Sequence, residues 1–388
     1  MNLQFRLPSR VFCFKAVVLF LTIISVNPVP GSLGQEKRLH RKSYVIIGYV
    51  GGYKGLIDTN MVHARKLTHI NYAFVDIKDN RAFLASPRKD SLNFIMLNKL
   101  KQGNPSLKIL ISIGGWSWST NFSDAALSDT SRSTFAISAV EIIRKYKLDG
   151  IDIDWEYPDQ SGDGNPNRTG DKHNYTLLFK ELRHQLNLAA PHGSRLLLTA
   201  AVGGFRQFLD HTEMDQVARY LDYVNLMTYD YFQDINGKAV HHTGLYGSKR
   251  YLSSDNADKA VSDFVQSGVP LKKLVIGLAF YGRSGRVQAD SVNGLGMKLV
   301  SLLPSGGYTY IKDSLRHKAG FSYYRDRNAR APYLYNAVTR QFITYDDEWS
   351  VKNKCHYVEK KGMAGVMFWE YADDRKEYLL DEINQVFR

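Results

Sequence analysis

Residues 149–156 read Asp149-Gly150-Ile151-Asp152-Ile153-Asp154-Trp155-Glu156. If this stretch is a β-strand, successive side chains point to opposite faces. Asp152, Asp154 and Glu156 then share one face, and the apolar residues between them share the other. Acidic residues are poor strand formers, and like charges on one face repel. The arrangement therefore predicts a function for the carboxylates: they share protons, bind a metal ion or carry out acid–base chemistry.

Two other interpretations of this stretch have to be weighed. A solvated edge strand would tolerate the charges, but the apolar opposite face argues against it. Hard cations such as Mg²⁺ and Ca²⁺ take oxygen ligands, so a metal site is the second alternative. Acid–base chemistry is favoured, because neighbouring carboxylates raise the pKa of at least one member and keep an acid protonated near neutral pH.

Short apolar runs alternate with helix-like stretches along most of the chain. The runs are 44–50, 68–74, 109–113, 148–156, 196–202, 223–229, 274–280 and 365–369. The helix-like stretches are 92–102, 131–146, 175–188, 213–220, 256–266, 345–361 and 376–386. This alternation predicts an α/β fold, a parallel (β/α)8 TIM barrel. The active sites of such barrels lie at the C-terminal ends of the strands. Glu156 would stand at the mouth, with Asp154 and Asp152 deeper inside.

The interval between Gly282 and Tyr345 breaks this alternation. It is rich in Tyr, Gly and Arg, and segments 321–324 and 342–344 look like short strands. It is too long for a plain loop. We therefore expect a small α+β insertion, residues 284–345, between strands seven and eight of a barrel formed by residues 35–283 and 346–388.

The N-terminus has the layout of a secretory signal peptide. Arg6, Arg10 and Lys15 precede an apolar run, 16–26, and small residues follow up to Gly34. Residues 1–34 are predicted to be removed on export. The apolar run is too short for a comfortable membrane span, although an uncleaved anchor is the alternative. We expect an extracellular protein, or a periplasmic one in a bacterium, without membrane association after cleavage.

The composition is that of an ordinary globular protein with a basic surface. The 388 residues are 44% hydrophobic and carry a formal net charge of +13. The basic residues are scattered and no nucleic-acid-binding motif occurs, so we expect no nucleic-acid partner. We also expect a monomer. Cys13 lies in the signal segment, which leaves Cys355 as a packed apolar residue and excludes an intramolecular disulfide. Asn121, Asn167 and Asn174 are glycosylation sequons that matter only in a host that glycosylates.

The motif Asp149-x-x-Asp152-x-Asp154-x-Glu156 resembles the signature of glycoside hydrolase family 18, the chitinases. Further stretches are similar to family motifs: Ser112-Ile113-Gly114-Gly115-Trp116, Met227-Thr228-Tyr229-Asp230, Tyr281-Gly282-Arg283, Trp369, and Tyr345-Asp346-Asp347-Glu348 with Ser350 and Lys354. The resemblance covers residues 43–388. Ala279 stands where the family often has Pro, and Glu370 follows the strand-eight Trp where the residue type varies.

The resemblance implies catalysis assisted by the substrate's own acetamido group, an exception to the usual two-carboxylate scheme. Glu156 would be the general acid and later the base. Asp154 would orient the acetamido nitrogen, Asp152 would share its proton, and Tyr229 would hydrogen-bond the acetamido oxygen. The resemblance implies no metal and no cofactor.

The predicted substrate-binding residues are Tyr49, Phe74, Trp116, Tyr157, Met227, Asp230, Tyr281, Arg283 and Trp369. Aromatic side chains suit the apolar faces of sugars, and Asp230 and Arg283 would contact hydroxyl groups. The simpler structural alternatives are core packing for Tyr49, Phe74 and Trp369, a surface ion pair for Arg283, and a structural hydrogen bond between Tyr229 and Asp230.

These observations predict a secreted, retaining hydrolase of β-1,4-linked N-acetylglucosamine polymers, chitin or chitooligosaccharides. One alternative is an endo-β-N-acetylglucosaminidase that acts on N-glycans or peptidoglycan by the same chemistry. The other is a non-catalytic chitin-binding lectin. Family members of the lectin type have lost the terminal Glu, so the presence of Glu156 favours an enzyme.

Overall fold

A computed structural model of the protein describes residue 13 and residues 43–233, 237–253, 255–288 and 293–388. The predicted signal peptide, residues 1–34, lies outside the described residues except for Cys13. No helix in the described ranges is long and apolar enough to cross a membrane.

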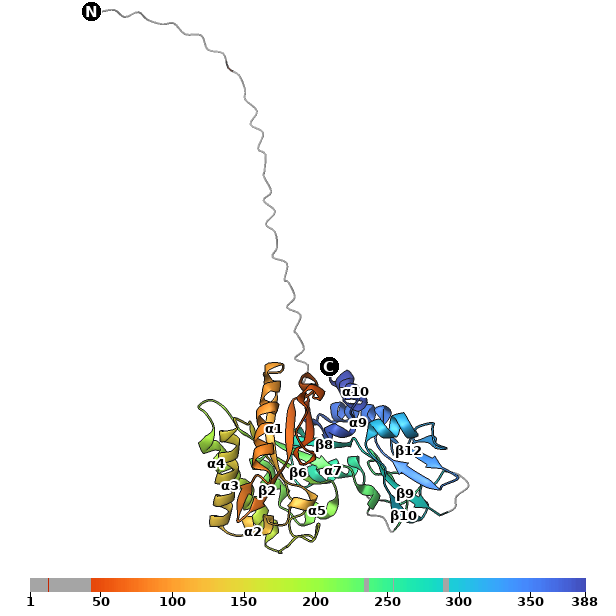
Figure 1. Ribbon diagram of the computed structural model, residues 1–388, viewed down its shortest axis with the longest axis horizontal. Helices are drawn as coiled ribbons and strands as arrows, with labels where there is room; N and C mark the ends of the chain where they lie inside the picture. The colour runs from red at the N-terminus through yellow and green to blue at the C-terminus, as the bar shows by residue number, and fades with distance from the viewer. Residues whose placement is uncertain (1–12, 14–42, 234–236, 254, 289–292) are drawn as a thin grey trace, which may run out of the picture. The chain divides into compact units, whose positions relative to one another are not determined.

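Within the described residues, eight parallel strands close into a barrel surrounded by helices (Figure 1). They are β1 (Val45–Gly51), β2 (His69–Lys78), β4 (Lys108–Gly114), β5 (Gly150–Asp154), β6 (Leu197–Gly203), β7 (Tyr223–Met227), β8 (Leu274–Ala279) and β14 (Gly365–Trp369). Strand β1 pairs with both β2 and β14, which closes the ring. A short antiparallel strand, β3 (Arg81–Phe83), extends β2. The predicted (β/α)8 barrel is confirmed.

The helices follow the predicted ones with shifted ends. They are α1 (Pro87–Lys99), α2 (Phe122–Ala125), α3 (Asp129–Lys145), α4 (Asp171–Ala189), α5 (Arg206–Asp210), α6 (Met214–Tyr220), α7 (Ala257–Gln266), α9 (Glu348–Lys361) and α10 (Tyr378–Phe387). The short helices α2 and α5 were not predicted. Helix α9 was expected to begin at 345, but the side chain of Asp347 accepts a hydrogen bond from the N–H of Ser350, and this capping box fixes its start at Glu348.

Short turns of 3-10 helix connect these elements. They are η1 (Gly52–Lys54), η2 (Thr59–Met61), η3 (Ala64–Lys66), η4 (Leu100–Gln102), η5 (Trp116–Trp118), η6 (Tyr231–Gln233), η7 (Leu271–Lys273) and η9 (Tyr371–Asp373). Four of them, η1, η5, η6 and η9, follow the C-terminal ends of barrel strands β1, β4, β7 and β14.

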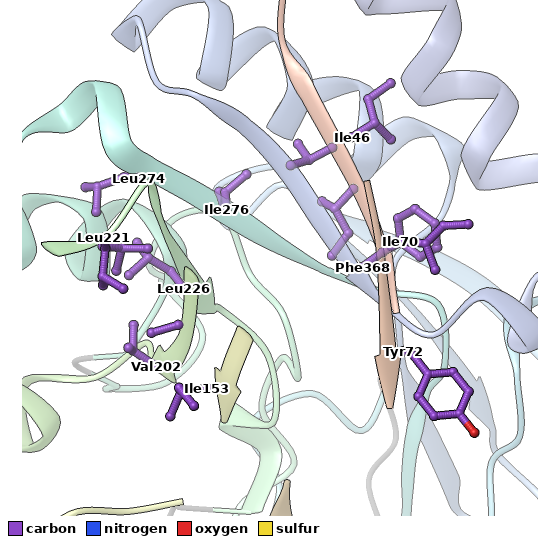
Figure 2. Close-up of a cluster of buried hydrophobic side chains, with 14 of the residues drawn as sticks. Ile46, Ile70, Tyr72, Ile153, Val202, Leu221, Leu226, Leu274, Ile276 and Phe368 are labelled. Atoms are coloured by element: carbon purple, nitrogen blue, oxygen red, sulfur yellow. The ribbon is translucent and has the colours of Figure 1, made fainter. Parts of the chain in front are cut away.

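The alternation of side chains along each strand divides the core into two layers. The outer layer packs between strands and helices, and Figure 2 draws part of it, including Ile46, Ile153 and Phe368. A separate inner cluster, which includes Ile47 and Met367, fills the barrel. Successive side chains of a strand enter the two layers in turn, so both faces of the strand are buried.

Strand β5 was predicted to continue to Glu156, but it ends at Asp154. Trp155 still packs outward and stacks on Phe122 with ring centroids 5.2 Å apart. The N–H of Glu156 then donates to the Ser119 hydroxyl at 2.9 Å instead of to a neighbouring strand. Glu156 therefore leaves the sheet and stands above its edge.

Between β8 and α9 the chain forms a second, antiparallel sheet within the same unit, Ser43–Arg388 (Figure 1). Its strands are β9 (Arg283–Val287), β10 (Leu299–Leu303), β11 (Ser322–Asp326), β12 (Ala331–Asn336) and β13 (Gln341–Thr344), in the order β10-β9-β13-β12-β11. The short helix α8 (Tyr308–Tyr310) and the π-helical turn η8 (Ile311–Leu315) connect β10 to β11. The sheet lies where the α+β insertion was expected, while the limits 284–345 remain a prediction.

A fully buried ion pair joins the return from this sheet to the barrel. Lys354 on α9 donates to both carboxylate oxygens of Asp346, at 2.9 and 2.7 Å, and to the Thr243 hydroxyl at 2.6 Å. Asp346 also accepts from the Ser350 hydroxyl and from the N–H of Ala279 on β8. The pair thus connects α9, β8 and the segment that follows β7.

Removing the cation alone should be costly, because it leaves a buried carboxylate without its charge partner. We expect Lys354→Met to lower the free energy of unfolding by ~3–5 kcal/mol in a urea titration. Adding Asp346→Asn should recover part of the loss, since the amide carries no charge and its single oxygen can still accept from one of the two donors, Ser350 or Ala279. A double variant less stable than Lys354→Met alone would contradict this explanation.

Candidate active site

A long groove of about 1220 Å³ opens at the C-terminal ends of the barrel strands. Every predicted site residue except Asp152 lines it: Tyr49, Phe74, Trp116, Asp154, Glu156, Tyr157, Met227, Tyr229, Asp230, Tyr281, Arg283 and Trp369. Asp152 is fully buried in the barrel interior, where Tyr49 and other inward-facing side chains surround it. The loop after β10, including Ser305 and Gly307, contributes to the wall on the side of the second sheet.

Asp152 is held by hydrogen bonds from four strands. Its Oδ2 accepts from Tyr49 Oη at 3.0 Å and Ser112 Oγ at 2.8 Å. Its Oδ1 accepts from Thr199 Oγ1 at 2.5 Å and Asn225 Nδ2 at 3.2 Å. Burial raises the pKa of Asp152 to about 6, although these hydrogen bonds favour the ionised form. The side chain is therefore fixed in place and titrates close to neutral pH.

Asp154 is buried but poorly satisfied. It is 4% exposed, and its Oδ1 has no hydrogen-bond partner among the described residues. Burial, and then the charges of Glu156 and Asp152, raise the pKa of Asp154 well above its usual range. This environment favours the protonated form of the carboxyl, and Oδ1 remains available to a ligand.

Glu156 is half-buried, and its backbone is held on both sides. Its N–H donates to Ser119, and its carbonyl oxygen accepts from Asn165 Nδ2 at 2.6 Å. Burial raises the pKa of Glu156 to about 7, and the charge of Asp230 contributes. An acid with this pKa is protonated near neutral pH, which is the state that a proton donor requires.

Asp230, which follows β7 and also lines the groove, accepts hydrogen bonds from two donors. Its Oδ1 accepts from Tyr281 Oη at 2.8 Å and from Arg283 Nε at 2.7 Å. Burial alone would raise the pKa of Asp230, but neighbouring His242 and then the Arg283 guanidinium and the Tyr281 hydroxyl outweigh it and keep the pKa below the ordinary value. Tyr229 packs edge-on against Tyr281, with ring centroids 6.2 Å apart. The pKa of Asp230 is thus lowered, whereas the pKa values of Asp152, Asp154 and Glu156 are raised.

Stacked aromatic rings line part of the groove. Phe74 stacks on Trp369 with centroids 5.4 Å apart, and Tyr53 stacks on Phe74 at 6.5 Å. Trp118 packs against both Tyr53 and Phe74. At another part of the groove, the half-exposed Trp116 meets Tyr157 edge-on. Flat apolar surfaces of this kind suit the faces of sugar rings.

Several residues of this site were not predicted from the sequence. Tyr53 and Trp118 belong to η1 and η5, and the spacing Trp116-Ser117-Trp118 after a strand was the available signal for Trp118. Thr199 and Asn225 interrupt apolar runs, which was a signal for polar contacts inside the barrel. No group of three or more His, Cys, Asp or Glu side chains in the described ranges is arranged to hold a metal ion.

A parallel barrel with an open groove at the C-terminal ends of its strands, and with buried carboxyl groups beneath it, is typical of (β/α)8-barrel enzymes. Residues 45–374 match the model of the family described as glycosyl hydrolases family 18. The chain is 34% identical to chitinase A1 of Niallia circulans, over 88% of this chain and 58% of the relative. It is 35% identical to chitotriosidase-1 of Mus musculus, over 78% of this chain and 66% of the relative.

Among solved structures, a glycoside hydrolase family 18 N-acetylglucosaminidase from Paenibacillus barengoltzii is similar with a TM-score of 0.82 and 38% identity, over 88% of this chain and 99% of that one. The chain therefore belongs to glycosyl hydrolase family 18, and the resemblance read from its motifs is confirmed. The matched region spans less than two thirds of the length of the two curated relatives.

The environment of Asp154 predicts a stability that depends on pH. Its pKa is raised in the folded protein, so the folded state loses stability as pH rises from the ordinary carboxyl value toward the folded value. Asp154→Asn removes the ionisable group. We expect its Tm to exceed that of the wild type at pH 8 by ~2 °C or more in calorimetry, with a smaller difference at pH 4.

The matched control is Asp79→Asn, which changes an exposed aspartate in a turn, where asparagine is also tolerated. It should leave the dependence of Tm on pH unchanged. A Tm of Asp154→Asn below that of the wild type at pH 8 would show that the carboxyl stabilises the fold.

Proposed function

We propose that the protein is a secreted hydrolase of β-1,4-linked N-acetylglucosamine polymers, chitin and chitooligosaccharides, which retains anomeric configuration by substrate-assisted catalysis. The observation that carries the proposal is Glu156, a half-buried carboxyl in the groove with its pKa raised to about 7. Such a group can protonate a glycosidic oxygen at neutral pH. Export is supported by the predicted signal peptide, residues 1–34.

The proposed reaction has two steps. Glu156 gives its proton to the glycosidic oxygen while the acetamido oxygen of the same sugar attacks the anomeric carbon, so the glycosidic bond breaks and a cyclic oxazolinium ion forms. Water then attacks the same carbon from the side of the departed group, its proton passes to Glu156, and the ring opens. Family 18 is an exception to the two-carboxylate scheme in this way. Retention follows from two displacements at one carbon.

The other carboxylates have distinct proposed roles. Asp154 would accept a hydrogen bond from the acetamido N–H and so make the acetamido oxygen more nucleophilic, for which its unpartnered Oδ1 is available. Asp152 would share a proton with Asp154, and their coupled titration belongs to the pair. Tyr229 would donate to the acetamido oxygen. Asp152 and Asp154 share one face of β5 and Glu156 lies just beyond its end, an arrangement that favours the substrate's own nucleophile.

Substrate binding is assigned to aromatic and charged residues that line the groove. Trp369 would carry the sugar at the cleavage point, and Phe74 would extend the apolar surface. Asp230 and Arg283 would contact hydroxyl groups of the sugars. The names of the chitinase relatives support chitin as the polymer. Product analysis would show which oligosaccharide length is preferred and whether the polymer is cleaved internally or from one end.

The decisive variant is Glu156→Gln, which is close to isosteric and removes the transferable proton. We expect turnover of chitooligosaccharides to fall by ~10²–10⁴-fold, while oligosaccharide binding measured by calorimetry persists. The control is Gln207→Glu, a conservative change of another groove-lining residue to which no step is assigned. Near-normal turnover by Glu156→Gln would reject Glu156 as the proton donor. A wild-type protein that binds the oligosaccharides without hydrolysing them would reject the enzymatic assignment and favour a lectin.

The mechanism can be tested separately through the acetamido group of the substrate. We expect oligomers without N-acetyl at the cleavage point to resist hydrolysis, a thiazoline analogue of the cyclic ion to inhibit, and the first product to be the β-anomer by NMR. EDTA should leave the rate unchanged. Initial release of the α-anomer, or a covalent glycosyl adduct on Asp152 or Asp154, would contradict substrate assistance even with chitin as substrate.

A further inference from the structure

His242 lies directly against the cluster of Asp230, Tyr281 and Arg283. Its Nδ1 accepts a hydrogen bond from the backbone N–H of Asp230 at 2.9 Å. Its ring packs edge-on against Tyr281 with centroids 4.8 Å apart. The side chain is 0% exposed. A buried histidine thus contacts two of the three members of a groove cluster without lining the groove itself.

The backbone of Asp230 needs an outside partner. Strand β7 ends at Met227, and Asp230 lies beyond it with φ of +65°, a left-handed conformation that aspartate tolerates but does not favour. Its N–H therefore has no acceptor on a neighbouring strand, and a buried N–H without an acceptor is costly. His242 supplies that acceptor from the segment that follows η6.

We propose that His242 is a positioning residue: it fixes the backbone of Asp230, and through it the carboxylate that orients Tyr281 and Arg283 for the sugar. The inference rests on the proposed function, because the sugar is what would require this geometry. Both Tyr281 and Arg283 donate to the same oxygen of Asp230, so a shift of the Asp230 backbone would move the whole cluster.

The protonation state of His242 agrees with this role. A ring nitrogen can accept an N–H only when it carries no proton, so Nδ1 is bare and the proton of the neutral ring is on Nε2. Burial lowers the pKa of His242 to about 3, although the charge of Asp230 opposes the shift. Nε2 has no hydrogen-bond partner within the described residues. Nδ1 therefore makes the polar contacts of this side chain, accepting from the N–H of Asp230 and lying 3.4 Å from its carboxylate oxygen Oδ1.

Three substitutions of His242 distinguish the loss of the hydrogen-bond acceptor at Nδ1 from a change in side-chain volume. In His242→Asn the Oδ1 atom stands at the same distance from Cβ as Nδ1, so the acceptor is retained. In His242→Gln the acceptor lies one bond further out, and in His242→Leu it is lost. We expect kcat/KM on chitooligosaccharides to fall by ~10–100-fold in His242→Leu and His242→Gln, and His242→Asn to keep most of it.

The neighbouring His241 is the matched control. It is equally buried, at 2% exposed, but its Nε2 pairs with Asp326 Oδ2 at 3.1 Å in the second sheet and not with the groove. His241→Leu should lower Tm while leaving kcat/KM close to the wild-type value. A general loss of packing would instead reduce activity to the same extent in both Leu variants.

A double-mutant cycle tests whether His242 acts through Asp230. In the Asp230→Ala background, His242→Leu should cause little further loss of kcat/KM, because the group that it positions is gone. Additive losses, a defect in His242→Asn as large as in His242→Leu, or equal losses in His241→Leu would overturn the inference. Wild-type protein that binds chitooligosaccharides without turnover would reject the proposed function alone, and the same variants would then be compared by binding affinity.

Discussion

One buried carboxylate, Asp152, depends on the register of the whole barrel. Burying a charge is expensive unless donors surround it, and the donors here come from β1, β4, β6 and β7. Ser112 and Thr199 are its direct partners in the pairing of β4 and β6 with β5. A slip of one residue would turn each of these side chains to the other face. The polar centre and the strand register therefore specify each other.

Much of the fold could be predicted because it follows from periodicity. Alternating strands and helices, with apolar residues at period 2 or 3.6, leave few topologies other than a parallel barrel. The outward packing of Ile153 and Trp155 and the inward position of Asp152 and Asp154 follow from the same rule. The candidate groove was largely predictable for a related reason, since residues at the ends of parallel strands converge at one edge.

The rest could not be predicted because it depends on contacts between distant segments. The end of β5 at Asp154 is set by Ser119, which captures the next N–H. Tyr53 stacks on Phe74 in the groove, and no local sequence pattern predicts this contact. The peptide bonds at Ala73–Phe74, Glu156–Tyr157 and Trp369–Glu370 are cis without proline, for which single-sequence reasoning has no signal. Such features arise when tertiary contacts decide local conformation.

The three carboxyls of the signature stretch form a graded series. Asp152 is fully buried and has four donors, Asp154 is buried with an unpartnered oxygen, and Glu156 has left the strand and faces the groove. From Asp152 to Glu156, the carboxyl groups make fewer hydrogen bonds within the protein and become more accessible to a ligand. A β-strand is well suited to build this series, because its period of two places alternate residues on one face at increasing height. The sequence spacing that looked unfavourable for a strand thus places the three carboxyl groups in a row from the barrel interior to the groove.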